Sequence, residues 1–358
     1  MRIVIVGASG NAGTALLRRL VDEPVITAVT GLCRRPPTAG EGAYAGVRWI
    51  TCDLAEDSSD DILRRAMTGA DVVVHLAWVI LHSHAPNLQW RINVDGSRRV
   101  FAAARDCGVA HLVCASSVGA YAPDSGLVRR DESWPVTGVP TSLYSRQKAA
   151  VEAVLDEVAV SSEMVVSRLR PGLIFQAEAG GQIARYFLGP LAPTSLLRIG
   201  HLPVVPLPRG LQMQAVHADD AADAYARVIL RRAGGAFNIA AEPVLDTDVL
   251  AGALGGRPLR VDPRVFRAAA TATWRARLQP TEPGWLDLAM TSPLLDTARA
   301  REVLGWQPQT SASEALRLLL AGLARGAGTQ SPAMGPRGPV SSVVKLRSAL
   351  QRRGQGRG

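Results

Sequence analysis

Lysine is almost absent from this chain of 358 residues: of its 40 lysine and arginine residues, only Lys148 and Lys345 are lysines. Arginine is therefore the usual cation, and a lysine is expected where a compact ammonium group is required and a broad guanidinium would not fit. Lys148, in the run YSRQK, is a candidate for such a position.

Cysteines are few, and long hydrophobic runs are missing. The four cysteines, Cys33, Cys52, Cys107 and Cys114, have neither the spacing of a zinc site nor that of a redox pair, which indicates reduced cysteines. The most apolar run, residues 71–81, is too short to cross a bilayer. The opening MRIVIV leads into a glycine turn without the cleavage site of a signal peptide. We therefore expect a cytoplasmic protein without membrane insertion.

Acidic residues are missing from the C-terminal segment, where most of the net charge lies. The chain carries +9, and the segment from Ser331 onward contributes +6 of it, so the rest carries only +3. A nearly neutral body argues against nucleic-acid binding. We expect residues 326–358 to form a basic, disordered tail, with a short helix over 343–353 on an acidic partner or membrane surface as the alternative.

Short β-branched runs alternate with helix-like segments through the first half of the chain, as in βαβ units. Apolar residues recur at helical spacing between these runs, for example in TALLRRLV after the first one. The pattern predicts an α/β fold with a doubly wound parallel sheet. The expected strands cover residues 2–6, 25–32, 47–52, 71–77, 111–116 and 164–169.

The run GASGNAG directly follows the first expected strand and opens the first expected helix. Its glycines, Gly7, Gly10 and Gly13, permit a tight turn and let backbone N–H groups reach a pyrophosphate at the helix N-terminus. Ser9 and Asn11 belong to the same turn and are expected at the cofactor. This context predicts a Rossmann-type dinucleotide site, with a merely tight βα turn as the alternative.

The end of the second expected strand lacks an acidic residue. An acid there would hold the ribose 2′-hydroxyl of NAD, but the chain has Cys33, Arg34 and Arg35. A guanidinium suits a 2′-phosphate, so NADP(H) is favoured and NAD(H) is the alternative. In an arginine-rich chain, both arginines could also be ordinary surface charges.

Tyr144 and Lys148 are four residues apart on an expected helix, so their side chains project from the same face. A tyrosine near its usual pKa of about 10 transfers protons poorly at neutral pH, and a neighbouring ammonium group lowers that pKa. The spacing therefore predicts an acid/base pair. A helix-face tyrosine with a solvated lysine is the alternative, because this spacing is common.

Several motifs together resemble those of the extended short-chain dehydrogenases/reductases, in the NAD-dependent epimerase/dehydratase family. They occur in the order expected for that family over residues 1–325: GASGNAG, CDL, HLAW, NVDG, SSVGAY, YSRQK, RPGLIF and VHADD. The predicted organisation is a Rossmann domain over residues 1–171, completed by about 211–241. A smaller C-terminal substrate-binding lobe is expected over 172–210 and 242–325.

The resemblance also implies roles for single residues. Ser117 would hydrogen-bond the substrate oxygen, Tyr144 would act as acid/base, and Lys148 would bind the nicotinamide ribose. Asn93 would brace the active-site helix, although it could instead be an ordinary residue at a helix N-terminus. The other residues expected at the cofactor are Ser116, Asp53, Leu54, Leu76, Ala77, Pro171, Gly172 and Ile174. The two serines could also simply end a strand.

Two departures from the family pattern narrow the substrate. Val118 and Gly119 follow Ser117, where sugar dehydratases of the family have an Asp–Glu pair, so a 4,6-dehydratase is disfavoured. Met213 stands where many nucleotide-sugar enzymes have an arginine for the diphosphate, although Arg209 could substitute. Without such an arginine, a less charged carbonyl or alcohol is favoured over a UDP- or dTDP-sugar.

The histidines give no sign of a metal site. His82 and His84 form an H-x-H run without a third ligand at useful spacing. His217 and Asp219, in VHADD, are expected to have a structural role, with Asp219 near a helix N-cap.

The sequence favours an NAD(P)-dependent oxidoreductase that transfers hydride between nicotinamide and a carbonyl or secondary alcohol of a small molecule. One alternative is a nucleotide-sugar epimerase that keeps its cofactor bound through each turnover. A second is a regulatory protein that binds NADP(H) without chemistry, against which the intact Ser117, Tyr144 and Lys148 argue. The resemblance implies that the chain could pair as a homodimer.

Overall fold

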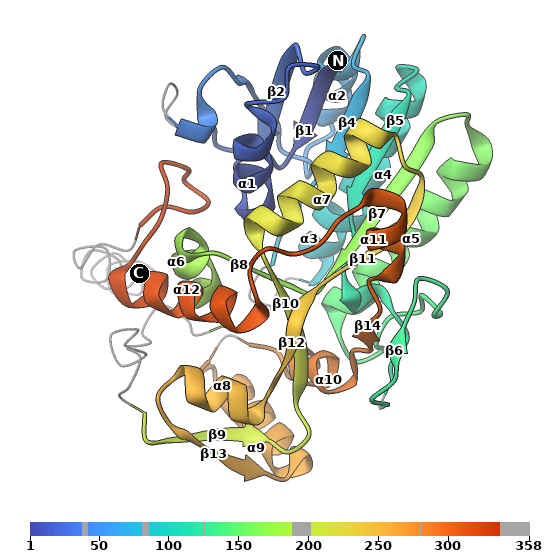
Figure 1. Ribbon diagram of the computed structural model, residues 1–358. Helices are drawn as coiled ribbons and strands as arrows, with labels where there is room; N and C mark the ends of the chain where they lie inside the picture. The colour runs from blue at the N-terminus through green and yellow to red at the C-terminus, as the bar shows by residue number, and fades with distance from the viewer. Residues whose placement is uncertain (38–41, 81–85, 125, 188–201, 280, 337–358) are drawn as a thin grey trace, which may run out of the picture.

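A parallel sheet of seven strands with helices on both faces forms the centre of the protein (Figure 1). The computed structural model describes the chain except for residues 38–41, 81–85, 125, 188–201, 280 and 337–358. In the order β11-β7-β5-β4-β1-β2-β3, all neighbouring strands pair in parallel. The strands are β1 (Arg2–Val6), β2 (Ala28–Cys33), β3 (Arg48–Thr51), β4 (Val72–His75), β5 (His111–Ala115), β7 (Val165–Pro171) and β11 (Gly235–Ile239). The predicted doubly wound, Rossmann-type sheet is confirmed.

The residues of β1 alternate between the two faces of the sheet. Ile3 and Ile5 belong to one hydrophobic cluster, and Val4 and Val6 belong to the other. A strand covered on both faces requires apolar residues at consecutive positions, which this run supplies. The first cluster includes residues of α1 (Asn11–Leu20), α7 (Ala218–Arg231) and α11 (Ala298–Leu304), and the second includes residues of α2 (Ser59–Met67), α4 (Gly96–Asp106) and α5 (Leu143–Ser161).

A smaller lobe is built from the second half of the chain. Its first sheet contains β8 (Leu173–Phe175), β10 (Gln212–His217) and β12 (Ala241–Asp246), and its second pairs β9 (Val204–Pro208) with β13 (Arg257–Val261). Residues 211–241 were expected to complete the Rossmann domain. Of the elements in this range, β11 lies in the seven-stranded sheet and α7 packs in its hydrophobic cluster, whereas β10 lies in the three-stranded sheet of the lobe. The helices of the lobe are α6 (Gly180–Phe187), α8 (Thr247–Ala253), α9 (Pro263–Arg275), α10 (Pro283–Thr291) and α12 (Ala312–Arg325).

Short elements connect the larger ones. α3 (Pro86–Trp90) continues through a π-helical turn (Arg91–Asp95) into α4, and β6 (Arg129–Arg130) pairs with β14 (Leu294–Leu295). Single 3-10 turns cover Gly42–Tyr44, Val118–Ala120 and Ala177–Ala179. None of the described helices combines the length and the hydrophobicity that crossing a bilayer requires.

The segment 327–336, which we call the C-terminal docking segment, folds back onto the Rossmann domain. The hydroxyl of Ser331 donates to the backbone oxygen of Ser9 at 2.6 Å. Met334 is fully buried, and its sulfur accepts a hydrogen bond from the Thr14 hydroxyl at 3.7 Å. The expectation of a disordered tail therefore does not hold for its first part, because a few small polar and apolar side chains find specific partners there.

Candidate active site

The predicted site residues gather at the carboxyl ends of the parallel strands. Gly7 follows β1, Leu76 and Ala77 follow β4, and Ser116 and Ser117 follow β5. Carboxyl ends of parallel strands share one edge of the sheet, which is where ligands bind in open α/β folds. The same edge carries Arg34 and Arg35 after β2, Asp53 and Leu54 after β3, and Pro171 at the end of β7.

The three glycines of the turn between β1 and α1 have different roles. Gly7 has φ +92°, and a Cβ there would lie 2.5 Å from the backbone nitrogen of Ala77. A Cβ on Gly13 would lie 2.5 Å from the carbonyl oxygen of Gly7. At Gly10 the closest such contact is 3.5 Å, and the backbone is in an ordinary extended conformation. The fold does not require glycine at Gly10, so this glycine leaves room for a ligand to approach the backbone.

The N-terminus of α1 fits a pyrophosphate group. Gly10 is the N-cap residue, so no side chain accepts the first N–H groups, and the first turn contains no acidic residue. Open N–H donors at the positive end of a helix dipole favour a bound phosphate. Arg34 and Arg35, which follow β2 at the same sheet edge, are exposed. No carboxylate of the described residues forms an ion pair with either arginine. These residues fit an NAD(P) cofactor.

The glycine turn is tied to β8 through Asn11. The side-chain nitrogen of Asn11 donates to the backbone oxygen of Ile174 at 3.0 Å, and its side-chain oxygen accepts from Gln176 at 2.5 Å. Gly172 lies against the backbone of β10, since a Cβ there would be 2.4 Å from the carbonyl oxygen of Gln214. The run from Pro171 to Ile174, expected along the nicotinamide, is thereby fixed next to the glycine turn.

Three residues expected at the cofactor have contacts within the protein. Asp53 accepts from the backbone nitrogen two residues further on at 3.0 Å, and Leu54 is buried. Asn93 accepts from the backbone nitrogen of Val79 at 2.8 Å, and it donates to the backbone oxygen of Val79 at 2.9 Å and to Gln147 at 3.0 Å. Asn93 thus joins the segment after β4 to α5, as a bracing residue would.

The turn after β5 fixes the start of α5. Ser142 is the N-cap residue of α5, and its hydroxyl accepts from the backbone nitrogen of Ser145. The hydroxyl of Ser145 in turn donates to the backbone oxygen of Gly119 at 2.5 Å. Ser117 caps the 3-10 turn that contains Gly119, because its hydroxyl accepts from the Gly119 nitrogen at 3.0 Å. The hydroxyl of Ser117 and the first turn of α5 are therefore held in one arrangement.

Tyr144 lies between two tryptophans and beside Ser117. Its ring centroid is 4.8 Å from that of Trp285 and 5.7 Å from that of Trp78. Burial raises the pKa of Tyr144 to about 12, and the hydrogen bond with Ser117 offsets part of that rise. The phenol is therefore protonated at neutral pH, which is the form of a proton donor. No sequence motif pointed to Trp285, since it comes from α10 in the lobe.

Lys148 projects from α5 one turn after Tyr144. Its ammonium group donates to the backbone oxygen of Ala115 at 2.8 Å and lies 3.6 Å from the ring centroid of Trp78. Burial lowers the pKa of Lys148 to about 8. The sequence predicted that this ammonium lowers the pKa of Tyr144, but the structure has it raised. Burial of the phenol outweighs an ammonium that is directed at Ala115 and Trp78 and lies 5.8 Å from the centre of the tyrosine ring.

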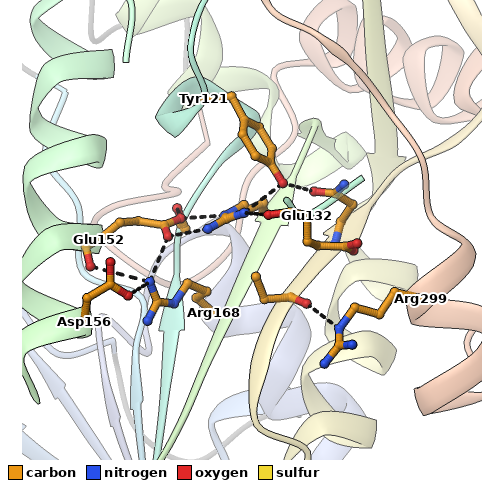
Figure 2. A network of polar contacts seen from close by, with 10 residues as sticks. Tyr121, Glu132, Glu152, Asp156, Arg168 and Arg299 are labelled. Carbon is orange, nitrogen blue, oxygen red and sulfur yellow. Dashed lines mark hydrogen bonds and ion pairs between the residues drawn. The ribbon is translucent and has the colours of Figure 1, made fainter. Parts of the chain in front are cut away.

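A buried ionic network connects α5 to β7 (Figure 2). Glu152 accepts hydrogen bonds from the Ser116 hydroxyl at 2.5 Å, from Arg170 at 2.8 and 2.7 Å, and from Arg168 at 3.1 Å. Burial opposes ionisation, but the hydrogen bonds and charge of Arg170 hold the pKa of Glu152 below its ordinary value. No sequence motif pointed to Glu152 as part of the site, although it lies four residues after Lys148 and therefore on the same helix face.

Other candidate residues lie away from this group or outside the described residues. The ring of His217 accepts from the backbone nitrogen of Asp219 at 3.3 Å and caps α7, which is a structural contact. Met213 lies opposite Leu245 in the β10–β12 pair. Arg209 is exposed in the connection between β9 and β10.

No metal centre is evident in the described part of the chain. Its histidines, cysteines and acidic residues form no group of three or more that could hold a metal ion. His82 and His84, the H-x-H run of the sequence, lie outside the described residues.

The comparisons with known proteins agree with this arrangement. The model of the NAD dependent epimerase/dehydratase family matches residues 3–240. An uncharacterized protein of Mycobacterium tuberculosis is 27% identical over 318 residues, which are 88% of this chain and 29% of that protein. A sterol-4-alpha-carboxylate 3-dehydrogenase of Saccharomyces cerevisiae is 31% identical over 179 residues, which are 48% of this chain and 51% of that enzyme. The chain thus spans only 29% and 51%, respectively, of the length of these two relatives.

The solved structures show the same fold. The UDP-glucose 4-epimerase of Thermus thermophilus, in complex with NAD, superposes with a TM-score of 0.65 over 90% of this chain and 99% of that one, at 21% identity. Because the family model covers most of the chain, the protein belongs to the NAD-dependent epimerase/dehydratase family. The proteins to which it is similar thus include a dehydrogenase and an epimerase that was solved with NAD.

Proposed function

We propose that the protein is an oxidoreductase that interconverts a carbonyl group and a secondary alcohol and uses NADP(H) in preference to NAD(H). The observation that supports this most directly is the closeness of Ser117 and Tyr144, since a Cβ on Gly119 would lie 2.8 Å from Cε1 of Tyr144 and 3.4 Å from Oγ of Ser117. Lys148 follows Tyr144 one helical turn further along α5. These side chains lie at the same sheet edge as the open N-terminus of α1, which fits the pyrophosphate.

Tyr144 moves the proton in this proposal. In the reducing direction it donates its phenolic proton to the carbonyl oxygen, while the hydroxyl of Ser117 hydrogen-bonds the same oxygen. A pKa of about 12 keeps the proton on Tyr144 at neutral pH until negative charge develops on that oxygen. A nicotinamide held by these residues would supply the hydride for the carbonyl carbon, and in alcohol oxidation it would accept a hydride while Tyr144 takes the proton.

Lys148 orients the cofactor by donating hydrogen bonds to ribose hydroxyls. Its ammonium lies in a narrow position between the ring of Trp78 and the backbone oxygen of Ala115. A planar guanidinium would not fit there, which accounts for a lysine in a chain that otherwise uses arginine. Arg34 and Arg35 would hold the 2′-phosphate that distinguishes NADP(H) from NAD(H).

The test combines cofactor binding with turnover. NADPH and NADH are titrated by nicotinamide fluorescence, and ketones and secondary alcohols are then screened by the nicotinamide absorbance. We expect tighter binding of NADPH, and a loss of kcat of about 10²- to 10⁴-fold in Tyr144→Phe with cofactor affinity unchanged. Unchanged turnover in Tyr144→Phe contradicts the acid/base role, and tighter binding of NADH contradicts the role of the two arginines.

The same measurements separate the alternatives. A nucleotide-sugar epimerase would be purified with its cofactor bound and would convert its substrate without a net change in nicotinamide absorbance. A regulatory protein would bind the cofactor but turn over none of the compounds.

A further inference from the structure

The outer end of the lobe carries a surface that is both apolar and strongly basic. It is formed by β9, β13 and α9, which lie together at the bottom of Figure 1, away from the Rossmann sheet. We call it the β13–α9 surface. Its residues are Val204, Leu259, Val265, Leu278, Arg257, Arg264, Arg275 and Arg277, all of which are exposed.

α9 contributes an apolar stripe that faces solvent. The helix has 13 residues and none of them is buried. Val265 in its first turn is 61% exposed, and Leu278 just beyond its end is 77% exposed. The stripe follows the spacing of one helix face and consists of Val265, Ala268, Ala269, Ala272 and Ala276. A helix that exposes such a stripe along its whole length is typical of an interaction surface.

The two strands beside α9 expose further apolar side chains. Val204 of β9 is 54% exposed and Leu259 of β13 is 55% exposed. Val204 is the register partner of Arg257, and Pro206 is the register partner of Leu259. Because register partners point to the same side of a sheet, these four exposed residues share one face. Apolar and basic side chains are thus mixed on that face.

The charge of this segment is strongly unbalanced. Between Arg257 and Gln279 the chain has six arginines and one acidic residue, Asp262. Two of the arginines are paired, Arg260 with Asp248 and Arg267 with Asp287, both at 2.6 Å. No carboxylate within the described part of the chain pairs with the other four: Arg257, Arg264, Arg275 and Arg277.

We propose that the β13–α9 surface docks on an anionic lipid bilayer. The four unpaired arginines match the negative charge of lipid phosphate groups, and the apolar stripe matches the boundary between headgroups and acyl chains. A second copy of the chain is a poorer occupant, because a two-fold contact would bring the same arginines against one another. The surface lies on the bilayer in this proposal, and none of the described helices crosses it.

The docked surface is linked to the proposed catalytic tyrosine through one helix. Arg267 of α9 holds both carboxylate oxygens of Asp287 in α10, at 2.6 and 2.9 Å. Two residues earlier in α10, Trp285 packs against Tyr144 with ring centroids 4.8 Å apart and ring planes inclined by 35°. An apolar ketone or alcohol dissolved in the bilayer is therefore the substrate class that this arrangement would serve. Only this assignment of the substrate rests on the proposed function; the docking itself does not.

The experiment measures binding of the full-length protein to vesicles without cofactor or substrate. Vesicles of phosphatidylcholine alone are compared with vesicles that also contain phosphatidylglycerol, by co-sedimentation at low and high salt. One variant reverses two charges, Arg264→Glu with Arg275→Glu, and a second makes the stripe polar, Val265→Asp with Leu278→Asp. The matched control reverses two exposed charges on α2 in the other domain, Arg64→Glu with Arg65→Glu. Thermal unfolding confirms that each variant is folded.

We expect binding that requires the anionic lipid and weakens at high salt. Both β13–α9 variants should lose affinity by at least about tenfold, and the α2 control should change by less than about twofold. The proposal is overturned if all three variants lose the same affinity for the vesicles, because net charge alone would then cause binding. It is also overturned if all three bind as tightly as the unchanged protein, because the basic C-terminal residues would then account for binding. A third outcome also overturns it: the protein does not bind the vesicles, and light scattering shows a dimer that is absent in the variant with Val265→Asp and Leu278→Asp.

Discussion

Arg170 holds both carboxylate oxygens of Glu152, with its Nε 2.8 Å from Oε1 and its Nη2 2.7 Å from Oε2. Both side chains are almost completely buried. Loss of one partner in such a pair leaves the other charge buried without compensation, which costs far more than loss of an exposed ion pair. The pair also fixes Ser116, whose hydroxyl donates to the same carboxylate at 2.5 Å.

The first prediction concerns this pair. Glu152→Gln should lower the free energy of unfolding by about 3–5 kcal/mol in urea titrations, because Arg170 is left unpaired. Asp156→Asn is the matched control: Asp156 accepts from Arg168 at 2.6 Å but its side chain is 69% exposed. We expect the control to lose about 1 kcal/mol or less. Similar losses in the two variants would show that burial of the network does not matter.

The second prediction is a decline of stability in acid. Burial lowers the pKa of His75 to about 3 and that of His111 to about 4, both from an ordinary value of 6.5. Below pH 6.5 the unfolded chain therefore binds protons that the folded protein does not, and the free energy of unfolding falls as pH falls from 6.5 to about 4. Each histidine contributes a slope of up to about 1.4 kcal/mol per pH unit.

Urea unfolding at pH 7, 6 and 5 checks this slope. His111→Asn should make the decline shallower by about 1.4 kcal/mol per pH unit, because one of the two buried imidazoles is gone. An unchanged slope would mean that the imidazole of His111 is protonated in the folded protein as readily as in the unfolded chain.

The third prediction concerns the space beside Tyr144, the proposed acid/base. A Cβ on Gly119 would lie 2.8 Å from Cε1 of Tyr144, whereas a Cβ on Gly252 in α8 would meet nothing within 4 Å. Gly119→Ala should therefore displace the Tyr144 ring and lower kcat at least about tenfold, since misplacement of a catalytic group by 1 Å is costly. Gly252→Ala should leave kcat unchanged and raise stability slightly. Equal kcat values in the two variants would contradict the tight contact.

The fourth prediction concerns the choice of cofactor. Arg34→Ser combined with Arg35→Ser should raise the Kd for NADPH at least about tenfold, because charge-assisted hydrogen bonds to the 2′-phosphate are lost. The Kd for NADH should change by less than about twofold. Fluorescence titration measures both, and Arg64→Ser combined with Arg65→Ser on α2 controls for the change in net charge. A parallel loss of NADPH and NADH binding would assign the two arginines to the fold instead.

The strands and the glycine turn could be predicted from the sequence because their signals are local. The four consecutive apolar residues IVIV in β1 indicate a strand that is buried on both faces of a sheet. The glycines of GASGNAG indicate a tight turn, whatever the rest of the fold is. β2 begins at Ala28, three residues after the predicted start at residue 25. Val25 and Thr27 form hydrogen bonds with Met1 instead of with a neighbouring strand. Local patterns thus give the element, while its ends depend on neighbours distant in sequence.

The surroundings of the candidate site could not be predicted in this way. Trp285 reaches Tyr144 only through the packing of α10, 141 residues further along the chain. The direction of the pKa shift of Tyr144 depends on that enclosure, so the i, i+4 spacing with Lys148 was not sufficient to predict it. The same i, i+4 spacing could have placed Glu152 on the helix face of Lys148. Its partners Arg168 and Arg170 could not be predicted, because they belong to β7, whose position beside α5 depends on the whole sheet.

The contact between Ser331 and Ser9 joins residues 322 positions apart. During synthesis the glycine turn leaves the ribosome before the docking segment that braces it, because the strands and helices from α1 to α12 lie between them in the sequence. At typical elongation rates of about 5–20 residues per second, this delay is on the order of tens of seconds. The turn between β1 and α1 therefore reaches its braced form only after the chain has been made as far as Ser331.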